Sequence, residues 1–329
     1  MKKLCTIIAL LTLILCTGNV FAQPEMGISW SDYKAAILDS ISGAKYVLAG
    51  VDVDQDGKQE FIVPIDYGIL NGIPTRQIAV FEAVGNNDYE LAWKYTYPGE
   101  AAGELVQPAV GDLDGDGNLE ILGIHVQPEG VDPALPNFYV FECKGDNDYG
   151  TEPTVAWDMN DNRRNNIRCA AAYDLDNDGK MEVILTDNKA PVIASVTNFD
   201  VPMWTIEYID SLSYERPDMA GITLCNMDGD EYMEVGLTPL QQKPQLDLYL
   251  IEYDGSAYQM IKPAPKHFYG KGVIHALDAA DLDGDGRDEL YIGAVETSLL
   301  YVVTKPTGDV TELDTTDIYF IGHVEHPDY

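Results

Sequence analysis

The sequence predicts an all-β fold, a β-propeller with about five blades of four antiparallel strands. Three observations support this. An acidic nine-residue phrase recurs five times, its first residues lie 60, 62, 52 and 55 residues apart, and β-type runs separated by Gly/Asn/Asp turns fill the intervals. Roughly four strands per 50–60 residues is the content of a propeller blade. We therefore expect a propeller, or an incomplete ring of a larger one.

The acidic phrase has the pattern D-x-D-x-D-G-x-x-E, and each copy is called a loop below. Oxygen-bearing side chains occupy positions 1, 3, 5 and 9 of every loop. The fourth loop departs from the pattern because it has Asn226 at position 1 and Glu231 in place of the glycine at position 6. The first to fifth loops span residues 52–60, 112–120, 174–182, 226–234 and 281–289.

The loops predict binding of calcium. Oxygen-only ligands suit a hard cation, and converging carboxylates repel one another when no cation lies between them. Zinc is not expected because no loop contains His or Cys, and magnesium is the weaker alternative because it prefers near-ideal octahedra. We expect about four to five ions. The expected ligands are the side chains at positions 1, 3, 5 and 9 and the backbone carbonyl at position 7: Asp52, Asp54, Asp56, Lys58, Glu60, Asp112, Asp114, Asp116, Asn118, Glu120, Asp174, Asp176, Asp178, Lys180, Glu182, Asn226, Asp228, Asp230, Tyr232, Glu234, Asp281, Asp283, Asp285, Arg287 and Glu289.

An EF-hand has similar acids but also needs a glutamate at position 12 and a helix on each side. Position 12 is not acidic in any loop, and a strand-like run follows instead. The residues there are Val63, Gly123, Leu185, Leu237 and Ile292. The sequence therefore excludes an EF-hand.

The N-terminus predicts export. Lys2 and Lys3 precede an apolar run over residues 4–15, and Ala22 ends a suitable cleavage site, so residues 1–22 are expected to be a signal peptide. Leu15 before Cys16 does not fit a lipoprotein signal, and no later run is long enough to span a membrane. We expect a periplasmic, cell-surface or extracellular protein.

Residues 23–45 are expected to lead into the propeller, with a short helix over residues 31–43, and residues 46–329 are expected to form the propeller itself. Residues 310–313 read as the last hairpin strand of the fifth unit. Residues 318–323 read as the approach to a sixth loop, which would begin near residues 333–343 at the observed spacing. Either the chain is truncated or its last strand closes the ring against N-terminal residues.

Composition narrows the classes of partner. The net charge is −35, and the sequence contains no basic stripe that could neutralise phosphates. Nucleic acid is therefore not expected as a partner. Three cysteines remain once the signal peptide is removed: Cys143, Cys169 and Cys225. They can form at most one disulfide within the chain, and no function is predicted for them. The residues just before the loops are small, as expected of the innermost strand of a blade, which is crowded around the central channel.

Recurring aromatic residues are expected to pack between blades: Tyr89, Tyr149, Tyr258, Trp93 and Trp157.

The repeated loop, with its spacing, resembles the FG-GAP/VCBS repeat family, whose relatives include the propellers of integrin α-subunits. The resemblance covers roughly residues 46–320. It implies that the loop binds calcium between strands of a blade, so that Asp52, Asp54, Asp56 and Glu60 and their counterparts are ligands. This chain ends every loop with Glu where the family often has Asp, and the FG and GAP signatures are weak, so the bacterial VCBS-like branch is the closer likeness.

Two functions follow as hypotheses. The chain contains no nucleophile elbow, HExxH zinc motif or P-loop. The leading hypothesis is therefore a secreted binding or adhesion module for a protein or carbohydrate ligand, in which calcium is mainly structural. The alternative is a polysaccharide lyase or hydrolase, for which Asp158 and Asp161 are a weak acidic pair. A fragment with no function of its own is a third reading. The pair His323 and His326 and the pair Arg163 and Arg164 are read as surface residues.

Overall fold

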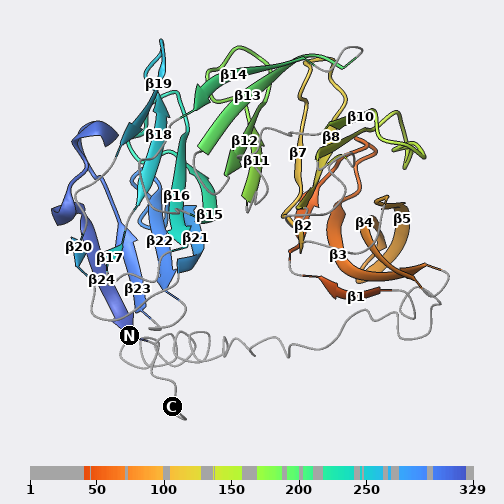
Figure 1. Ribbon diagram of the computed structural model, residues 1–329. Coiled ribbons are helices and arrows are strands. Elements are labelled where there is room, and N and C mark those ends of the chain that lie inside the picture. Colours follow the sequence, from red (N-terminus) through yellow and green to blue (C-terminus); the bar gives the residue numbers. More distant parts are fainter. Residues whose placement is uncertain are drawn as a thin grey trace, which may run out of the picture.

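The computed structural model describes residues 41–323, with interruptions at residues 45, 71–72, 99–103, 127–135, 137, 158–168, 187–190, 200–202, 210–217, 241–244, 247, 262–265, 268–273 and 295–298. The described residues form five antiparallel sheets that follow one another along an arc, with the first and fifth sheets at its two ends (Figure 1). This is the all-β, propeller-like architecture that the sequence predicts.

The first two sheets contain five strands each, with β2 and β7 pairing beside the main path. The first sheet runs β1-β3-β4-β5 and the second runs β10-β9-β8-β6. Their strands are β1 (Ile41–Ala44), β2 (Leu48–Val51), β3 (Glu60–Leu70), β4 (Ile73–Gly85), β5 (Asp88–Thr96), β6 (Glu104–Leu105), β7 (Ala109–Gly111), β8 (Glu120–Val126), β9 (Phe138–Glu142) and β10 (Val155–Trp157).

The remaining three sheets have four strands each, in the orders β11-β12-β13-β14, β15-β16-β18-β19 and β21-β22-β23-β24, and β17 pairs with β20 as a separate ribbon. Their strands are β11 (Cys169–Tyr173), β12 (Glu182–Thr186), β13 (Pro191–Asn198), β14 (Met203–Ile209), β15 (Asp218–Cys225), β16 (Glu234–Leu240), β17 (Gln245–Leu246), β18 (Tyr249–Tyr253), β19 (Tyr258–Ile261), β20 (Lys266–His267), β21 (Ile274–Ala280), β22 (Glu289–Ala294), β23 (Leu299–Val303) and β24 (Ile318–His323).

Each acidic loop joins two paired antiparallel strands of one sheet: β2 to β3, β7 to β8, β11 to β12, β15 to β16 and β21 to β22. The strands that enter the loops contact one another in the order β7, β11, β15, β21, so they form the inner side of the arc. Small residues allow this approach. A Cβ atom on Gly221 of β15 would lie 3.1 Å from the Cβ atom of Leu277 in β21.

The hydrophobic core lies between successive sheets. Every residue of β12 is buried, because both faces of this central strand are covered. Four of the apolar clusters each join two neighbouring sheets. They pair the first sheet with the second, the second with the third, the third with the fourth and the fourth with the fifth.

The residue at loop position 2 enters the junction with the following sheet. Leu113, for example, is fully buried among Val183 and Val192 of the third sheet. Val53, Leu175 and Met227 are at most 1% exposed in the equivalent places. Leu282 of the fifth loop is 71% exposed, because the described residues contain no sixth sheet to cover it.

Three sequence expectations need correction or fall outside the described residues. Residues 31–40 of the expected helix are not described, and Ile41–Ala44 form β1, which pairs with β3, so the helix is wrong at its end and the first sheet begins by Ile41. Val310–Glu312 form a 3-10 turn (η1) followed by a second turn, η2 (Thr315–Asp317), where a strand was expected. The expected approach to a sixth loop is β24, the outer strand of the fifth sheet.

The junctions predict where apolar truncation is costly. Leu113→Ala leaves a cavity between the second and third sheets and should lower the free energy of unfolding by about 2–5 kcal/mol. Leu282→Ala, at the equivalent position of the fifth loop, should change it by no more than about 0.5 kcal/mol in dilute solution. Chemical denaturation followed by circular dichroism measures both, and equal effects would contradict the assignment of loop position 2 to the junctions.

Candidate metal centres

Every loop is closed by the same hydrogen bond. The backbone N–H at position 2 donates to Oε2 of the glutamate at position 9, which lies at the start of the following strand. The donor–acceptor distance is 2.7 Å for Glu60, Glu120, Glu182 and Glu234 and 3.2 Å for Glu289. The glutamate therefore draws the beginning and the end of the loop together.

Two further bonds fix the aspartates. The position 7 N–H donates to Oδ1 of the position 5 aspartate in all five loops, at 2.7–2.9 Å. The position 6 N–H donates to Oδ2 of the position 1 aspartate in four loops, at 2.9–3.1 Å. The donors there are Gly57, Gly117, Gly179 and Gly286, whose φ angles of 90–94° favour glycine.

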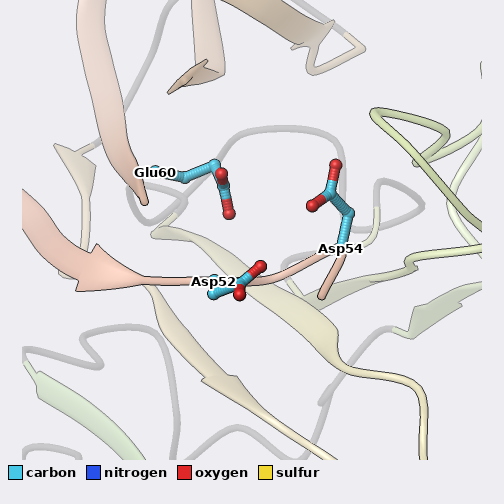
Figure 2. A group of neighbouring side chains, drawn as sticks. All are labelled: Asp52, Asp54 and Glu60. Atoms are coloured by element: carbon cyan, nitrogen blue, oxygen red, sulfur yellow. The ribbon is translucent and has the colours of Figure 1, made fainter. Parts of the chain in front are cut away.

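In the first three loops, carboxylates face a common point. Figure 2 shows Asp52, Asp54 and Glu60 directed toward one another, and one oxygen from each lies within 4.8 Å of the others. The same holds for Asp112 with Asp114 and Glu120 and for Asp174 with Asp176 and Asp178. The arrangement gathers negative charge at a site of mixed burial.

In three loops, one oxygen of the position 9 glutamate has no hydrogen-bond partner among the described residues. Oε1 of Glu60, Glu120 and Glu234 is buried and accepts no hydrogen bond, and the same is true of Oδ1 of Asp52. An unsatisfied buried carboxylate oxygen is costly unless a cation binds it. The donor set, which consists of oxygens in irregular loops, fits a hard cation.

Burial raises the pKa of these glutamates. The pKa of Glu60 rises to about 7, and the pKa values of Glu120, Glu182 and Glu234 rise to about 8. Removal from water is the main cause in each case, and the aspartates of the same loop raise the pKa further, although the N–H donor at position 2 opposes both effects.

The fourth loop keeps this closure but changes the group at position 1. Oδ1 of Asn226 accepts from the N–H of Gly229 at 2.6 Å, and its Nδ2 donates to the carbonyl of Asp230 at 2.9 Å. In the other loops, Oδ2 of the position 1 aspartate accepts a hydrogen bond from the position 6 N–H. In the fourth loop, the Nδ2 group of Asn226 replaces that oxygen and is itself a donor. The loop offers one carboxylate fewer.

Neighbouring loops are hydrogen-bonded to one another. The N–H of Met181 in the third loop donates to the carbonyl of Asp112 in the second at 3.2 Å. The N–H of Asp288 in the fifth loop donates to the carbonyl of Asn226 in the fourth at 2.7 Å, and Asp288 accepts from the N–H of Asn226 at 2.8 Å. Side chains join the other neighbours: Nε2 of Gln55 donates to the carbonyl of Gly117 at 2.7 Å, and Nδ2 of Asn177 donates to the carbonyl of Glu231 at 2.8 Å. The loops thus form a continuous row.

Two acids outside the loops join these groups, and neither was predicted from the sequence. Asp146, in the turn after β9 of the second sheet, has an oxygen within 4.8 Å of Asp54 and Asp56. Glu207 of β14 has one within the same distance of Asp176 and Glu182. No local pattern marks Glu207. The turn containing Asp146 was recognisable as a hairpin, but its approach to the first loop depends on how two sheets pack.

Three of the recurring aromatic residues pack between sheets. Nε1 of Trp93 donates to the carbonyl of Gly150 at 2.7 Å, and its ring lies 5.4 Å from that of Tyr149. Tyr258 belongs to the cluster between the third and fourth sheets. Tyr89 instead packs against Phe61 of its own sheet, at 5.4 Å.

Other residues singled out from the sequence carry no site in the described part of the chain. Asp158, Asp161, Arg163, Arg164 and His326 lie outside it. Cys143 and Cys225 are free and buried. No helix among the described residues is long and apolar enough to cross a membrane.

The raised pKa values predict the pH dependence of the metal-free protein. Folding favours the protonated glutamates, so their contribution to stability is fully present below about pH 4.5 and is lost as pH rises through about 8, at no more than about 1.4 kcal/mol per pH unit for each residue. Glu120→Gln keeps an acceptor for the N–H of Leu113 and removes the titrating group. In EDTA, its stability relative to wild type should therefore increase between pH 5 and pH 8.

The matched control is Glu142→Gln, because Glu142 pairs with Glu120 across β8 and β9 but is only half-buried. Its stability relative to wild type should stay nearly constant over the same range. Urea denaturation at both pH values measures the difference, and a Glu120→Gln effect independent of pH would contradict the assignment.

Comparison with known proteins includes a family match and a curated relative. Residues 52–123 match the model of the FG-GAP-like repeat. Rhamnogalacturonan exolyase YesX of Bacillus subtilis (strain 168) is 28% identical over a 254-residue alignment that covers 61% of this chain and 39% of that protein. The chain thus spans about two fifths of the relative's length.

Solved structures with similar coordinates include the Vibrio cholerae (V. cholerae) biofilm matrix protein Bap1, with a TM-score of 0.40, 17% identity and coverage of 80% of this chain and 38% of that one. An exo-inulinase from Aspergillus awamori has a TM-score of 0.44, 9% identity and coverage of 81% and 66%. The resemblance to the FG-GAP/VCBS repeat family is borne out by the family match: residues 52–123, which hold the first two loops, form an FG-GAP-like repeat.

Proposed function

We propose that the chain is an exported calcium-binding propeller that serves as a carbohydrate-binding module, with calcium in a structural role. The observation that carries the calcium proposal is the buried, unpartnered Oε1 of Glu60, Glu120 and Glu234. The side chains at positions 1, 3, 5 and 9 would hold the ions. The carbonyls at position 7 would complete the ligand sets.

Calcium is favoured over magnesium by the ligand geometry. The first two clusters combine half-buried aspartates with one buried glutamate, and Asp146 and Glu207 lie close enough to add to the first and third loops. Irregular sites with many oxygens suit calcium, which accepts six to eight ligands, better than magnesium. Extracellular calcium sites commonly bind with dissociation constants of about 0.1–1 mM, which accords with the expected export.

Calcium should stabilise the folded protein. A site held at ten times its dissociation constant adds about 1.4 kcal/mol to the free energy of unfolding, because the ion binds only the folded state. Calcium should therefore raise the melting temperature relative to EDTA, and elemental analysis should find four to five ions. Glu120→Gln should lower the stoichiometry by about one, and Glu142→Gln should not. An unchanged melting temperature or the absence of bound calcium would refute the proposal.

The carbohydrate part of the proposal is supported by the relative. Its name assigns it a rhamnogalacturonan as substrate, and the alignment covers more than half of this chain. The charge of −35 and the acidic loop row disfavour polyanionic nucleic acid as a ligand. A polysaccharide bound mainly through hydroxyl groups is compatible with such a surface, because hydroxyls donate to carboxylates.

A second candidate, favoured by the same relative, is a polysaccharide lyase. Lyase activity would need a base and an electrophile beside the scissile bond, and the described residues offer acidic clusters for which the repeat already supplies a structural role. The binding module is therefore the better-supported proposal, and the lyase is its alternative.

One experiment separates the two. The calcium-loaded protein is titrated with rhamnogalacturonan and with neutral and anionic polysaccharides by calorimetry, and the same mixtures are followed for unsaturated products. Saturable binding without product supports the module. Turnover would establish the enzyme, and neither binding nor turnover across the panel would refute both carbohydrate proposals while leaving the calcium result unaffected.

A further inference from the structure

The fourth loop contains a buried acceptor that its own residues do not satisfy. Glu234 is 0% exposed, its Oε2 accepts from the N–H of Met227 at 2.7 Å, and its Oε1 has no hydrogen-bond partner among the described residues. Position 1, an aspartate in the other four loops, is Asn226. The loop therefore has the same unsatisfied oxygen as the first and second loops but one carboxylate fewer to hold a cation beside it.

A second buried glutamate lies opposite Glu234, outside the loop. The register of β16 and β18 pairs the residues next to Glu234 and Glu252, so the two glutamates lie opposite each other on one face of the sheet. Glu252 is 3% exposed. Burial is the main cause of the raised pKa of Glu234, and among the nearby charges Glu252 ranks after Asp228 and ahead of Asp230. Glu252 therefore faces the place where the loop gathers its carboxylates.

The first and second sheets also have a glutamate opposite position 9, and a lysine lies beside each of them. Nζ of Lys58 contacts both Glu82 and Asp56 in the first sheet, so an ammonium group joins the strand glutamate to loop position 5. In the second sheet, Nζ of Lys144 lies 4.0 Å from Oε2 of Glu142. The chain supplies its own cation at both of these places.

Glu252 has no such cation in the described part of the chain. Position 7 of its loop is Tyr232 where the first loop has a lysine, and two residues after Glu252 stands Asp254 where the second sheet has a lysine. Its carboxylate accepts from the neutral amide of Gln259 at 3.5 Å. Burial raises the pKa of Glu252 to about 7, and the charges that raise it further are acids, led by Asp309. A buried carboxylate among acids is costly unless a cation lies beside it.

An aspartate of the fifth sheet joins this group. The N–H of Val310 donates to Oδ2 of Asp228, at loop position 3, at 3.1 Å. The preceding residue, Asp309, is exposed and caps η1 through its Oδ1, which accepts from the N–H of Thr311 at 2.8 Å. Burial is the main cause of the raised pKa of Asp230, at position 5, and the charge of Asp309 adds to it. Asp309 thus lies beside the loop, on the side of the fifth sheet.

The junction of the first and second sheets has an equivalent aspartate. There the N–H of Asn147 donates to Oδ2 of Asp54, also at position 3, at 2.8 Å, and the residue before the donor is Asp146. One oxygen of Asp146 lies within 4.8 Å of oxygens of Asp54 and Asp56. The two junctions therefore present equivalent acids, but only the first places an ammonium group between position 5 and the strand glutamate.

We propose that one calcium ion joins the fourth sheet to the fifth and takes its side-chain ligands from both. The ligands are Asp228, Asp230 and Glu234 of the loop, Glu252 of β18, and Asp309 before η1. The strand glutamate supplies the carboxylate that position 1 lacks, and no lysine competes for it. A set of oxygens from three segments suits the irregular coordination of calcium. This site rests on the proposed calcium role of the loops and belongs to the one loop that departs from the pattern.

The first test is Glu252→Gln in the full mature chain, a change that keeps the size of the side chain and an acceptor for Gln259. Calcium titration by calorimetry should show one site weakened at least about tenfold, because ligand charge sets calcium affinity. Glu142→Gln is the matched control, because Glu142 holds the same strand position beside Lys144, and it should leave every site unchanged. In EDTA at pH 8, Glu252→Gln should melt no lower than wild type, which shows that the variant folds.

Two changes in the loop test the role of the strand glutamate. Asn226→Asp restores the carboxylate at position 1, and in combination with Glu252→Gln it should recover the weakened site. Tyr232→Lys places an amine where the first loop has one and should weaken the same site by engaging Glu252. Tyr232→Gln is its control, because it loses the same ring contact with Tyr253 without adding a charge.

The share of the fifth sheet is tested by Asp309→Asn, which should weaken the same site. Asp314→Asn is the matched control, because Asp314 caps η2 as Asp309 caps η1, with its Oδ1 accepting from the N–H of Thr316 at 2.6 Å. It should leave calcium binding unchanged.

The outcomes separate this site from the loop proposal. A wild type that binds no calcium refutes both. A Glu120→Gln protein that loses an ion, together with a Glu252→Gln protein that titrates like wild type, overturns the shared site and leaves the loop proposal standing. A double variant that stays weak despite Asn226→Asp overturns the role given to Glu252.

Discussion

The hydrogen bond from the position 2 N–H to the position 9 glutamate is the interaction on which the rest of the structure depends. The donor residue carries the apolar side chain that fills the next junction, and the acceptor carries the oxygen that faces the aspartates. A single bond of 2.7 Å therefore couples two otherwise separate features of the fold. Any change that displaces Glu120 also displaces Leu113, and with it the contact between the second and third sheets.

This coupling explains why calcium would act as a structural element more than as a switch. The aspartates are already held by backbone N–H groups at positions 6 and 7 in the described chain. An ion that enters such a site finds its ligands in place and requires little rearrangement. Its effect would be to remove the cost of burying the glutamate in charged form, a cost that appears in the metal-free protein as a raised pKa.

The sequence predicted the repeated features of the fold and missed those that depend on contacts between sheets. Loop spacing and hairpin patterns fixed the number and order of the sheets, and the acidic positions placed Asp52, Asp54 and Glu60 in one cluster. The approach of Asp146 and Glu207 requires the packing of one strand or turn against another element, which no local pattern encodes. The fifth unit shows the same limit, because two 3-10 turns displaced its outer strand to residues 318–323.

A stack of sheets in which each contacts only its neighbours is stabilised by a sum of intrinsic and junction terms, so its ends are its weakest units. The fifth loop shows this directly. Its closing bond is 3.2 Å long where the others are 2.7 Å, and its position 2 residue lies in solvent. The fourth loop is incomplete in a different way, because Asn226 removes a carboxylate although both neighbouring sheets are present. Burial and ligand charge thus vary independently along the arc. If the loops bind calcium as proposed, the affinity of each loop should depend on both.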